Sequence, residues 1–214
     1  APPDRFAVTG RPYAPAIREG YPEAEAVVRM SDWNPSVKHE GKYFYDDDFF
    51  STEPSFFDIF TFPLLEGDPK TALKDPHTVV ITEEMAKKYF GSEEPMGKTL
   101  ILNDTLTYTV TGIAAAVPGN SHFRFDFLTS WITEESRNPV SNDEWLSLGI
   151  YTYVLLKEGT DAAAFETKIS DLVERNFGEQ LQQIGIRTEL EIDPLTDIYL
   201  QSDRGGQIGP TGDL

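Results

Sequence analysis

One side of a predicted helix in the last third of the chain is apolar. Its members are Phe165, Ile169, Leu172, Val173 and Phe177. Because they recur at the helical period, they predict an amphipathic helix that Thr160 caps and that ends near Phe177. Residues 150–157 before this helix and residues 188–193 after it have the apolar patterns of strands. The sequence therefore predicts a strand–helix–strand unit, which is right-handed if its two strands are parallel.

The two ends of the chain predict one subdomain, and the middle predicts another. A helix over Ala14–Glu19 and a strand over Ala24–Met30 open the chain, and they could complete the sheet of the strand–helix–strand unit. We therefore predict a mixed α/β (α+β) fold. In it, residues 1–45 and 146–214 form an α/β subdomain, and a β-rich subdomain of residues 46–145 is inserted between them.

The middle of the chain carries a well-marked helix and a hairpin. A β-rich run over His77–Ile81 leads into a helix over Glu83–Phe90, which Thr82 caps and Gly91 ends. Acidic residues at its start and lysines near its end suit the helix dipole. Farther along, Asn103-Asp104 predicts a hairpin turn. The two arms of that hairpin are Lys98–Leu102 and Thr105–Ile113.

Two earlier segments predict a loop and a short helix. Ser31–Gly41 is polar and contains Asn34-Pro35, which is typical of a loop. Thr52 is predicted to cap a short helix with one apolar face. That face consists of Phe56, Ile59 and Phe60.

The charge balance excludes one class of partner. The chain has 18 Lys and Arg against 36 Asp and Glu, so its net charge is -18. Such a surface repels a phosphate backbone and an anionic lipid leaflet, and no basic stripe with interleaved aromatic residues offsets it. We expect no nucleic-acid partner, and the acidity itself is explained by solubility.

The absence of cysteine and of long apolar runs sets further limits. Without Cys, the chain has neither a disulfide nor a Cys-ligated zinc site. No apolar run in the sequence approaches the roughly 20 residues that a membrane-spanning helix needs. The chain begins with Ala1 rather than Met, from which we expect a piece of a longer parent protein.

No residue pattern predicts catalysis or metal binding. The candidate catalytic residues of a hydrolase are Ser121-His122, His39 and His77. However, the chain lacks a Gly-x-Ser-x-Gly nucleophile elbow, and two residues adjacent in sequence do not form a catalytic triad. Asp46-Asp47-Asp48 could bind calcium, although the central Gly and final Glu of a calcium loop are missing. A solvated acidic turn is the simpler interpretation. We predict no catalytic, cofactor-binding or metal-binding residue.

Two remaining motifs also have structural interpretations. Gly97-Lys98-Thr99 resembles the end of a phosphate-binding loop, but a strand rather than a helix follows it, which indicates a turn entering a hairpin. Several phenylalanine pairs could line an apolar ligand groove, yet core packing produces the same spacing. They are Phe49-Phe50, Phe56-Phe57 and Phe60 with Phe62.

A series of short motifs is spread along the chain from about Pro22 to Ser202. The motifs are Phe49-Phe50, Phe56-Phe57-Asp58-Ile59-Phe60, Leu64-Leu65-Glu66-Gly67-Asp68-Pro69, Val79-Val80-Ile81-Thr82-Glu83, Ala86-Lys87-Lys88-Tyr89-Phe90-Gly91, Pro95-Met96-Gly97-Lys98, Tyr108-Thr109-Val110-Thr111-Gly112-Ile113, Pro118-Gly119-Asn120-Ser121-His122-Phe123 and Asp197-Ile198-Tyr199-Leu200-Gln201-Ser202. Each motif is weak alone, but together and in this order they resemble the periplasmic core domain of MacB/FtsX-type ABC transporter permeases.

The resemblance implies a fold and a role. In this family, a porter-like α/β part is made from both chain ends, and a Sabre-like part is inserted. The family members are permeases of the bacterial inner membrane with the domain on the periplasmic side. The resemblance implies four kinds of partner. They are the protein's own transmembrane helices, a cytoplasmic ABC ATPase that binds the ATP, a second copy in the intact transporter, and a periplasmic adaptor or envelope protein. This domain would then hold no cofactor and transmit ATP-driven movement without catalysis.

Two other classes of function remain open at this point. A free periplasmic module that binds a small ligand or peptide predicts saturable binding. A secreted hydrolase predicts an activity that is lost when an acidic residue or His122 is changed. We expect the isolated domain to be a monomer.

Overall fold

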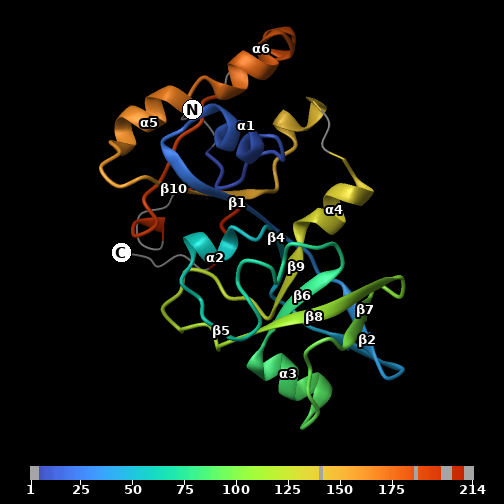
Figure 1. Ribbon diagram of the computed structural model, residues 1–214. Coiled ribbons are helices and arrows are strands. Elements are labelled where there is room, and N and C mark those ends of the chain that lie inside the picture. The colour runs from blue at the N-terminus through green and yellow to red at the C-terminus, as the bar shows by residue number, and fades with distance from the viewer. Residues whose placement is uncertain (1–4, 140–141, 186–187, 199–203, 210–214) are drawn as a thin grey trace. The chain divides into compact units, whose positions relative to one another are not determined.

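The chain forms two compact units in a computed structural model that describes residues 5–139, 142–185, 188–198 and 204–209 (Figure 1). The terminal unit comprises residues 1–27 and 140–214, and the inserted unit comprises residues 28–139. Strand β1, Ala24–Asp32, passes from the first unit into the second. The predicted mixed α/β fold is confirmed. Part of the last family-like motif, Tyr199–Ser202, lies outside the described residues.

The inserted unit contains a mixed sheet, with strand order β1-β4-β9-β6-β8-β7-β2-β3 and β5 paired to β8. Strands β4 and β9 are parallel, as are β6 and β8, and the other described pairs are antiparallel. The bounds are β2 Ser36–His39, β3 Lys42–Tyr45, β4 Phe49–Thr52, β5 Leu64–Glu66, β6 Thr78–Thr82, β7 Thr99–Leu102, β8 Leu106–Ala114 and β9 Phe127–Ser130.

Helix α3, Glu83–Phe90, lies against this sheet and has the ends that the sequence predicts. The Oγ1 atom of Thr82 accepts a hydrogen bond from the N–H of Met85 at 3.4 Å, which caps the helix. Gly91 ends it with a φ of 62°, a conformation that costs glycine little. Met85, Tyr89 and Phe90 are buried in a core with residues of β4, β6, β7, β8 and β9.

The predicted hairpin is confirmed as β7–β8. Asn103 and Asp104 have φ values of 49° and 57°, and the pairing of Leu102 with Leu106 leaves residues 103–105 as the loop between the two strands. The Oδ1 atom of Asn103 also accepts a hydrogen bond from the N–H of Ser36 at 3.0 Å. The turn therefore closes one hairpin and positions the start of a neighbouring strand.

Two predictions for the inserted unit are wrong. Residues 31–41 are not all loop, because β1 continues to Asp32 and β2 pairs with β7. Thr52 does not cap a helix: it ends β4, and its hydroxyl donates to the carbonyl of Arg29 at 2.8 Å. The short helix α2, Phe56–Ile59, begins after Ser55, which makes no capping hydrogen bond. After α2 and α3, the unit has a further helix, α4, Trp131–Arg137.

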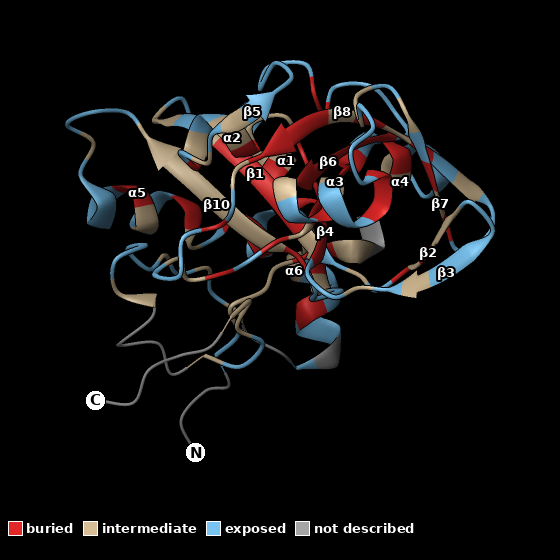
Figure 2. Cartoon of the chain, turned by 90° about the horizontal axis from the view of Figure 1, so that it is seen from below, coloured by how far each residue is buried: buried red, intermediate tan, exposed pale blue. Residues whose placement is uncertain are grey.

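The terminal unit packs helices against a small number of extended segments. Its elements are α1 Tyr13–Gly20, the 3₁₀ turn η1 Asn142–Leu146, β10 Tyr151–Leu156, α5 Ala162–Ile169 and α6 Leu172–Ile184. Strand β10 is the neighbour of β1, so the opening helix and strand do join the structure of the last third. Buried residues of α1, α5 and α6 form one apolar core. Figure 2 shows the buried faces of these elements in red.

The predicted long helix is two helices. Asp161, not Thr160, caps α5, because its Oδ1 atom accepts hydrogen bonds from Ala163 and Ala164 at 3.0 and 3.2 Å. The helix breaks at Ser170 and Asp171. The carbonyl of Lys168, left at the end of α5, accepts hydrogen bonds from the Tyr21 hydroxyl at 3.1 Å and from Arg175 at 3.3 Å.

The second strand of the predicted strand–helix–strand unit is absent from residues 188–193, which are described and form no strand. Their N–H groups bond to the helices instead. Ile192 donates to the Glu166 carboxylate at 2.9 Å, and Leu190 donates to the Ser170 carbonyl at 3.4 Å. The alternating apolar residues still pack on the core of the terminal unit, which explains why their pattern resembles that of a strand.

Residues 28–45 lie with the middle of the chain, because β2 pairs with β7 and β1 pairs with β4. The sequence-based division had assigned them to the subdomain of the chain ends. The identification of the two parts as porter-like and Sabre-like stays a prediction.

Candidate functional site

The phenylalanines that could have lined a ligand groove pack on one another. Phe56 is fully buried, and its ring centroid lies 5.0 Å from that of Phe60 and 5.7 Å from that of Phe125. Phe123 is 5.2 Å from Phe60. In β4, Phe49 stacks on Phe127 of β9 at 3.9 Å. These contacts favour the interpretation as core.

The three histidines stand apart and lie against aromatic rings. His39 contacts Phe90 at a ring distance of 4.8 Å, and His77 contacts Tyr108 at 5.6 Å. His122 lies 4.7 Å from Phe123, and burial lowers its pKa. This arrangement supports packing roles and gives no support to a Ser121-His122 hydrolase.

The acidic run that could have bound calcium is engaged within the protein. Asp46 accepts hydrogen bonds from the Lys88 ammonium group and the Tyr89 hydroxyl. Burial and the neighbouring carboxylates raise the pKa of Asp126 to about 6, and burial raises the pKa of Asp48. Within the described residues, no three metal-ligating side chains gather in a group that could hold an ion.

The segment that resembles a phosphate-binding loop is the entry to β7. Gly97 has a φ of 77°, and its N–H donates to the carbonyl of Val110 at 2.8 Å. Lys98 pairs with Glu93 rather than extending from a loop over a helix N-terminus. The geometry is that of a turn before a strand.

A buried ion pair in the inserted unit was missed by the sequence analysis. Arg29 of β1 lies 2.8 Å from Glu53 and 3.2 Å from Glu135, and its side chain is only 3% exposed. Its guanidinium lies 4.6 Å from the centroid of the Trp131 ring. The available signal was an arginine within the apolar run Val27-Val28-Arg29-Met30, since a buried arginine needs a partner. No local pattern indicated which carboxylates those partners are.

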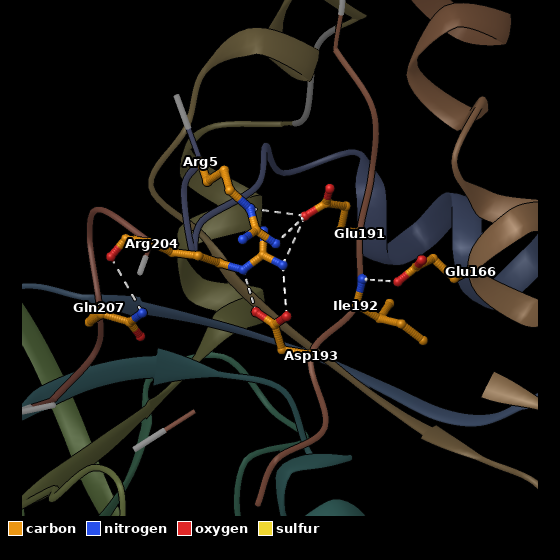
Figure 3. A network of polar contacts seen from close by, with 7 residues as sticks. All are labelled: Arg5, Glu166, Glu191, Ile192, Asp193, Arg204 and Gln207. Atoms are coloured by element: carbon orange, nitrogen blue, oxygen red, sulfur yellow. Dashed lines mark hydrogen bonds and ion pairs between the residues drawn. The ribbon is translucent and has the colours of Figure 1, made fainter. Parts of the chain in front are cut away.

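A second charged network lies in the terminal unit (Figure 3). Arg204 bonds to both carboxylate oxygens of Asp193, one of them at 2.7 Å, and lies 3.0 Å from Glu191. Arg5 donates to the same Glu191 oxygen at 2.7 Å. Hydrogen bonds from Arg5 and Arg204 lower the pKa of Glu191. This network fastens residues 191–193 to the start of the chain and presents no reacting group.

A shallow hollow of about 400 Å³ lies between α1 and α6. Two of its polar side chains are already bonded: Arg175 pairs with Asp171 at 2.9 Å, and Asn176 donates to the carbonyl of Leu172 at 2.7 Å. Neither side chain is presented to a ligand as the convergent polar groups of a binding pocket are. In the described part of the chain, no helix combines the length and apolar character needed to cross a bilayer.

Comparison with known proteins identifies the family. The family model described as MacB-like periplasmic core domain matches residues 2–172. A domain of a protein assigned as a permease from Porphyromonas gingivalis is 24% identical, with a TM-score of 0.71 over 88% of this chain and 81% of that chain. No curated protein matches the chain.

Two transporter structures are similar at lower identity. The periplasmic region of MacB from Actinobacillus actinomycetemcomitans is 16% identical, with a TM-score of 0.62 over 84% of this chain and 84% of that chain. The extracellular domain of the noncanonic ABC-type transporter YknZ from Gram-positive bacteria is 14% identical, with a TM-score of 0.60 over 80% and 86%. At these identities the structures establish a shared fold. The family match covers most of the sequence, and the chain therefore belongs to the MacB-like periplasmic core domain family of ABC transporter permeases.

Proposed function

We propose that this domain transmits ATP-driven movement from the membrane part of an ABC permease to proteins of the cell envelope, without catalysing a reaction itself. The observation that carries the proposal is the family match over residues 2–172. ATP is bound and hydrolysed by a separate cytoplasmic ATPase domain or subunit, and this domain itself holds no cofactor. The movement serves export or another envelope process.

The fold supports a mechanical role through strand β1. Residues 24–27 of this strand belong to the terminal unit, and residues 28–32 belong to the inserted unit. Just beyond the division, Arg29 is bonded to Glu53 by both its backbone N–H and its side chain. A strand with a buried ionic anchor is suited to bear force that reaches the inserted unit through the chain, because a packed element deforms little.

The proposed setting is the periplasmic side of the bacterial inner membrane. There the partners are the permease's own transmembrane helices, its ATPase, a second copy in the assembled transporter, and a periplasmic adaptor or envelope protein. The coding DNA on both sides of this chain provides the first test. One apolar span before Ala1 and three after Leu214 support the proposal, whereas a cleavable signal peptide with a stop codon soon after Leu214 supports a free binding module instead.

A spin-label experiment tests the movement itself. The chain has no cysteine, so one introduced cysteine gives a single label in this domain. Glu179→Cys on α6 and Lys87→Cys on α3 are suitable because both side chains are exposed. In the assembled transporter, each of the two copies carries one label. The distance between these two labels should change on ATP binding and return to its starting value after hydrolysis. The matched control is a transporter whose ATPase lacks its catalytic glutamate. In this control the distance between the labels should stay at the value of the ATP-bound state. Nucleotide-independent distances at both positions would refute the proposal.

A further inference from the structure

We propose that the free edge of β3 binds an extended, lysine- or arginine-bearing segment of a partner protein as an added strand. Strand β3 is the last strand in the order of its sheet, and among the described residues only β2 pairs with it. Its outer edge therefore offers the hydrogen-bonding groups that β-strand addition uses. The inference deepens the partner part of the proposed function.

The turn geometry shows which backbone groups face outward. The β2–β3 turn consists of Glu40 and Gly41, with φ values of 47° and 77°, which makes it a two-residue hairpin closed by His39 and Lys42. Hydrogen-bonded and non-hydrogen-bonded pairs alternate from that closing pair. Tyr43 and Tyr45 are therefore in non-hydrogen-bonded pairs, and their N–H and C=O groups point away from β2.

A contact on β2 confirms this alternation. Ser36 is the pairing partner of Tyr45, and its backbone N–H and C=O groups point away from β3, toward the β7–β8 hairpin. Its N–H donates to the side chain of Asn103 at 3.0 Å, and its carbonyl accepts from the N–H of Asn103 at 2.9 Å. The pair of Ser36 and Tyr45 is thus a non-hydrogen-bonded one, and the outward backbone of Tyr45 follows.

The side chains on this edge have the character of an interface. Tyr45 is 83% exposed and Tyr43 is 47% exposed, and both lie on the sheet face opposite Phe44, which packs against Tyr89. The hydroxyl of Tyr43 donates to Asp104 at 2.5 Å, which holds its ring against the surface. Tyrosine gives a large contact area at a low cost in conformational entropy, and it is enriched at the centres of protein interfaces.

The charge around the edge selects a basic partner. Glu40 stands exposed in the turn, Asp47 and Asp48 follow β3 exposed, and Asp104 lies beside Tyr43. Two lysines on the same hairpin, Lys38 and Lys42, offset part of this charge, and the whole chain carries -18. A second copy of the chain would bring the same excess of negative charge, so a segment with lysines or arginines is the complementary occupant.

Two synthetic peptides test the proposal on the 214-residue chain. One has eight residues that alternate lysine with valine or threonine, and the other has glutamate in place of each lysine. The readout is the chemical shift and hydrogen exchange of the Tyr43 and Tyr45 amides, which separates edge pairing from general attraction to an acidic protein. The basic peptide should protect both amides, and the acidic peptide should not.

Two substitutions at position 45 distinguish the contribution of the backbone N–H to peptide binding from that of the tyrosine ring. Tyr45→Pro removes an outward N–H without removing a hydrogen bond to β2, and it should weaken binding of the basic peptide about fivefold to tenfold. Tyr45→Thr keeps the N–H and should retain the protection of the Tyr43 amide. The double change Glu40→Gln with Asp47→Asn should weaken binding without touching the edge, which keeps the test valid if proline disturbs the hairpin.

Three results would overturn the inference. One is binding of the basic peptide with no change at the Tyr43 and Tyr45 amides, and another is equal protection of these amides by both peptides. The third is protection of these amides with formation of a dimer when the domain alone is concentrated, which would make a second copy the occupant. None of these results involves ATP or the membrane, so a failure here is distinguishable from a failure of the proposed transmission.

Discussion

The carboxylate of Glu53 bonds to Arg29 at two places. One oxygen lies 2.8 Å from the guanidinium nitrogen Nη2, and the other accepts the backbone N–H of Arg29 at 2.9 Å. The two side chains are 3% and 11% exposed, so water compensates little if either partner is removed. A buried charge that loses its partner is costly, and the first prediction depends on this asymmetry.

Glu53→Gln should lower the free energy of unfolding by about 3 kcal/mol, because it leaves the guanidinium of Arg29 buried with an incomplete counter-charge. Urea denaturation monitored by circular dichroism measures the loss. Glu135→Gln is the matched control, since Glu135 is 37% exposed and its removal leaves the Arg29–Glu53 pair in place. That control should lose about 1 kcal/mol or less. Equal losses would show that Glu53 has no special role.

Asp126→Asn should stabilise the protein at neutral pH. The pKa of Asp126 is raised from 3.8 to about 6 by burial and by repulsion from Asp48, Glu84 and Asp46. The folded state therefore binds more protons than the unfolded state between about pH 4 and pH 6, and stability falls as the pH rises through that window. Since the residue is only partly buried, screening reduces the expected gain at pH 7 to about 1 kcal/mol.

Denaturation of this variant from pH 3.5 to pH 7.5 checks the sign. The gain should disappear below about pH 4, where Asp126 is protonated in both states. The control is Asp58→Asn, which removes one exposed negative charge elsewhere in the inserted unit. If the control gains as much, then general charge repulsion rather than the surroundings of Asp126 explains the effect.

Alanine at two glycines of the terminal unit should have opposite effects. A Cβ atom on Gly10 would stand 2.2 Å from the carbonyl oxygen of Glu144, which is backbone and cannot move aside cheaply. Gly10→Ala should therefore cost about 2 kcal/mol or more. A Cβ on Gly20, the last residue of α1, meets no atom within 4 Å, so Gly20→Ala should gain up to about 0.5 kcal/mol from helix propensity. Thermal unfolding of both variants decides the matter, and a loss at Gly20 similar to that at Gly10 would contradict the prediction.

Arg204→Ala should loosen residues 188–193. The Arg204 side chain is 10% exposed and pairs with both Asp193 and Glu191. Its loss should speed the hydrogen exchange of the Leu190 and Ile192 amides and cost about 1 kcal/mol. Arg5→Ala leaves Arg204 in place and should have a smaller effect on the same amides. Unchanged exchange in Arg204→Ala would show that contacts with the helices alone position this segment.

The isolated chain should sediment as a monomer. Its net charge of -18 makes copies repel at low ionic strength. Sedimentation velocity at low and high salt measures the state. A tight dimer in both conditions would contradict the expectation.

Local patterns were sufficient where neighbours in sequence determine the structure. The cap at Thr82, the stop at Gly91 and the turn at Asn103-Asp104 depend on backbone preferences of a few adjacent residues, and all three are confirmed. The order of the short motifs also led to the family, because a series of turns and helix ends is itself a property of the sequence.

Contacts between distant residues decided the rest. The alternation at Leu190 and Ile192 shows only that one face is buried, and the structure buries it against helices without a paired strand. Likewise, β2 is a strand because β7 lies beside it, although Val37 is its one buried residue.

The Arg29–Glu53 pair shows the same limit at the level of chemistry. The apolar surroundings of Arg29 in the sequence imply that the residue needs a partner, and the abundance of acidic residues leaves that partner undefined. It lies 24 residues away, directly after the end of β4, and the antiparallel pairing of β1 with β4 brings it alongside. The sequence by itself thus determined the family and those helix ends and turns that adjacent residues set, whereas the tertiary structure decided the pairing of strands and of buried charges, because these depend on which distant segments share a desolvated space.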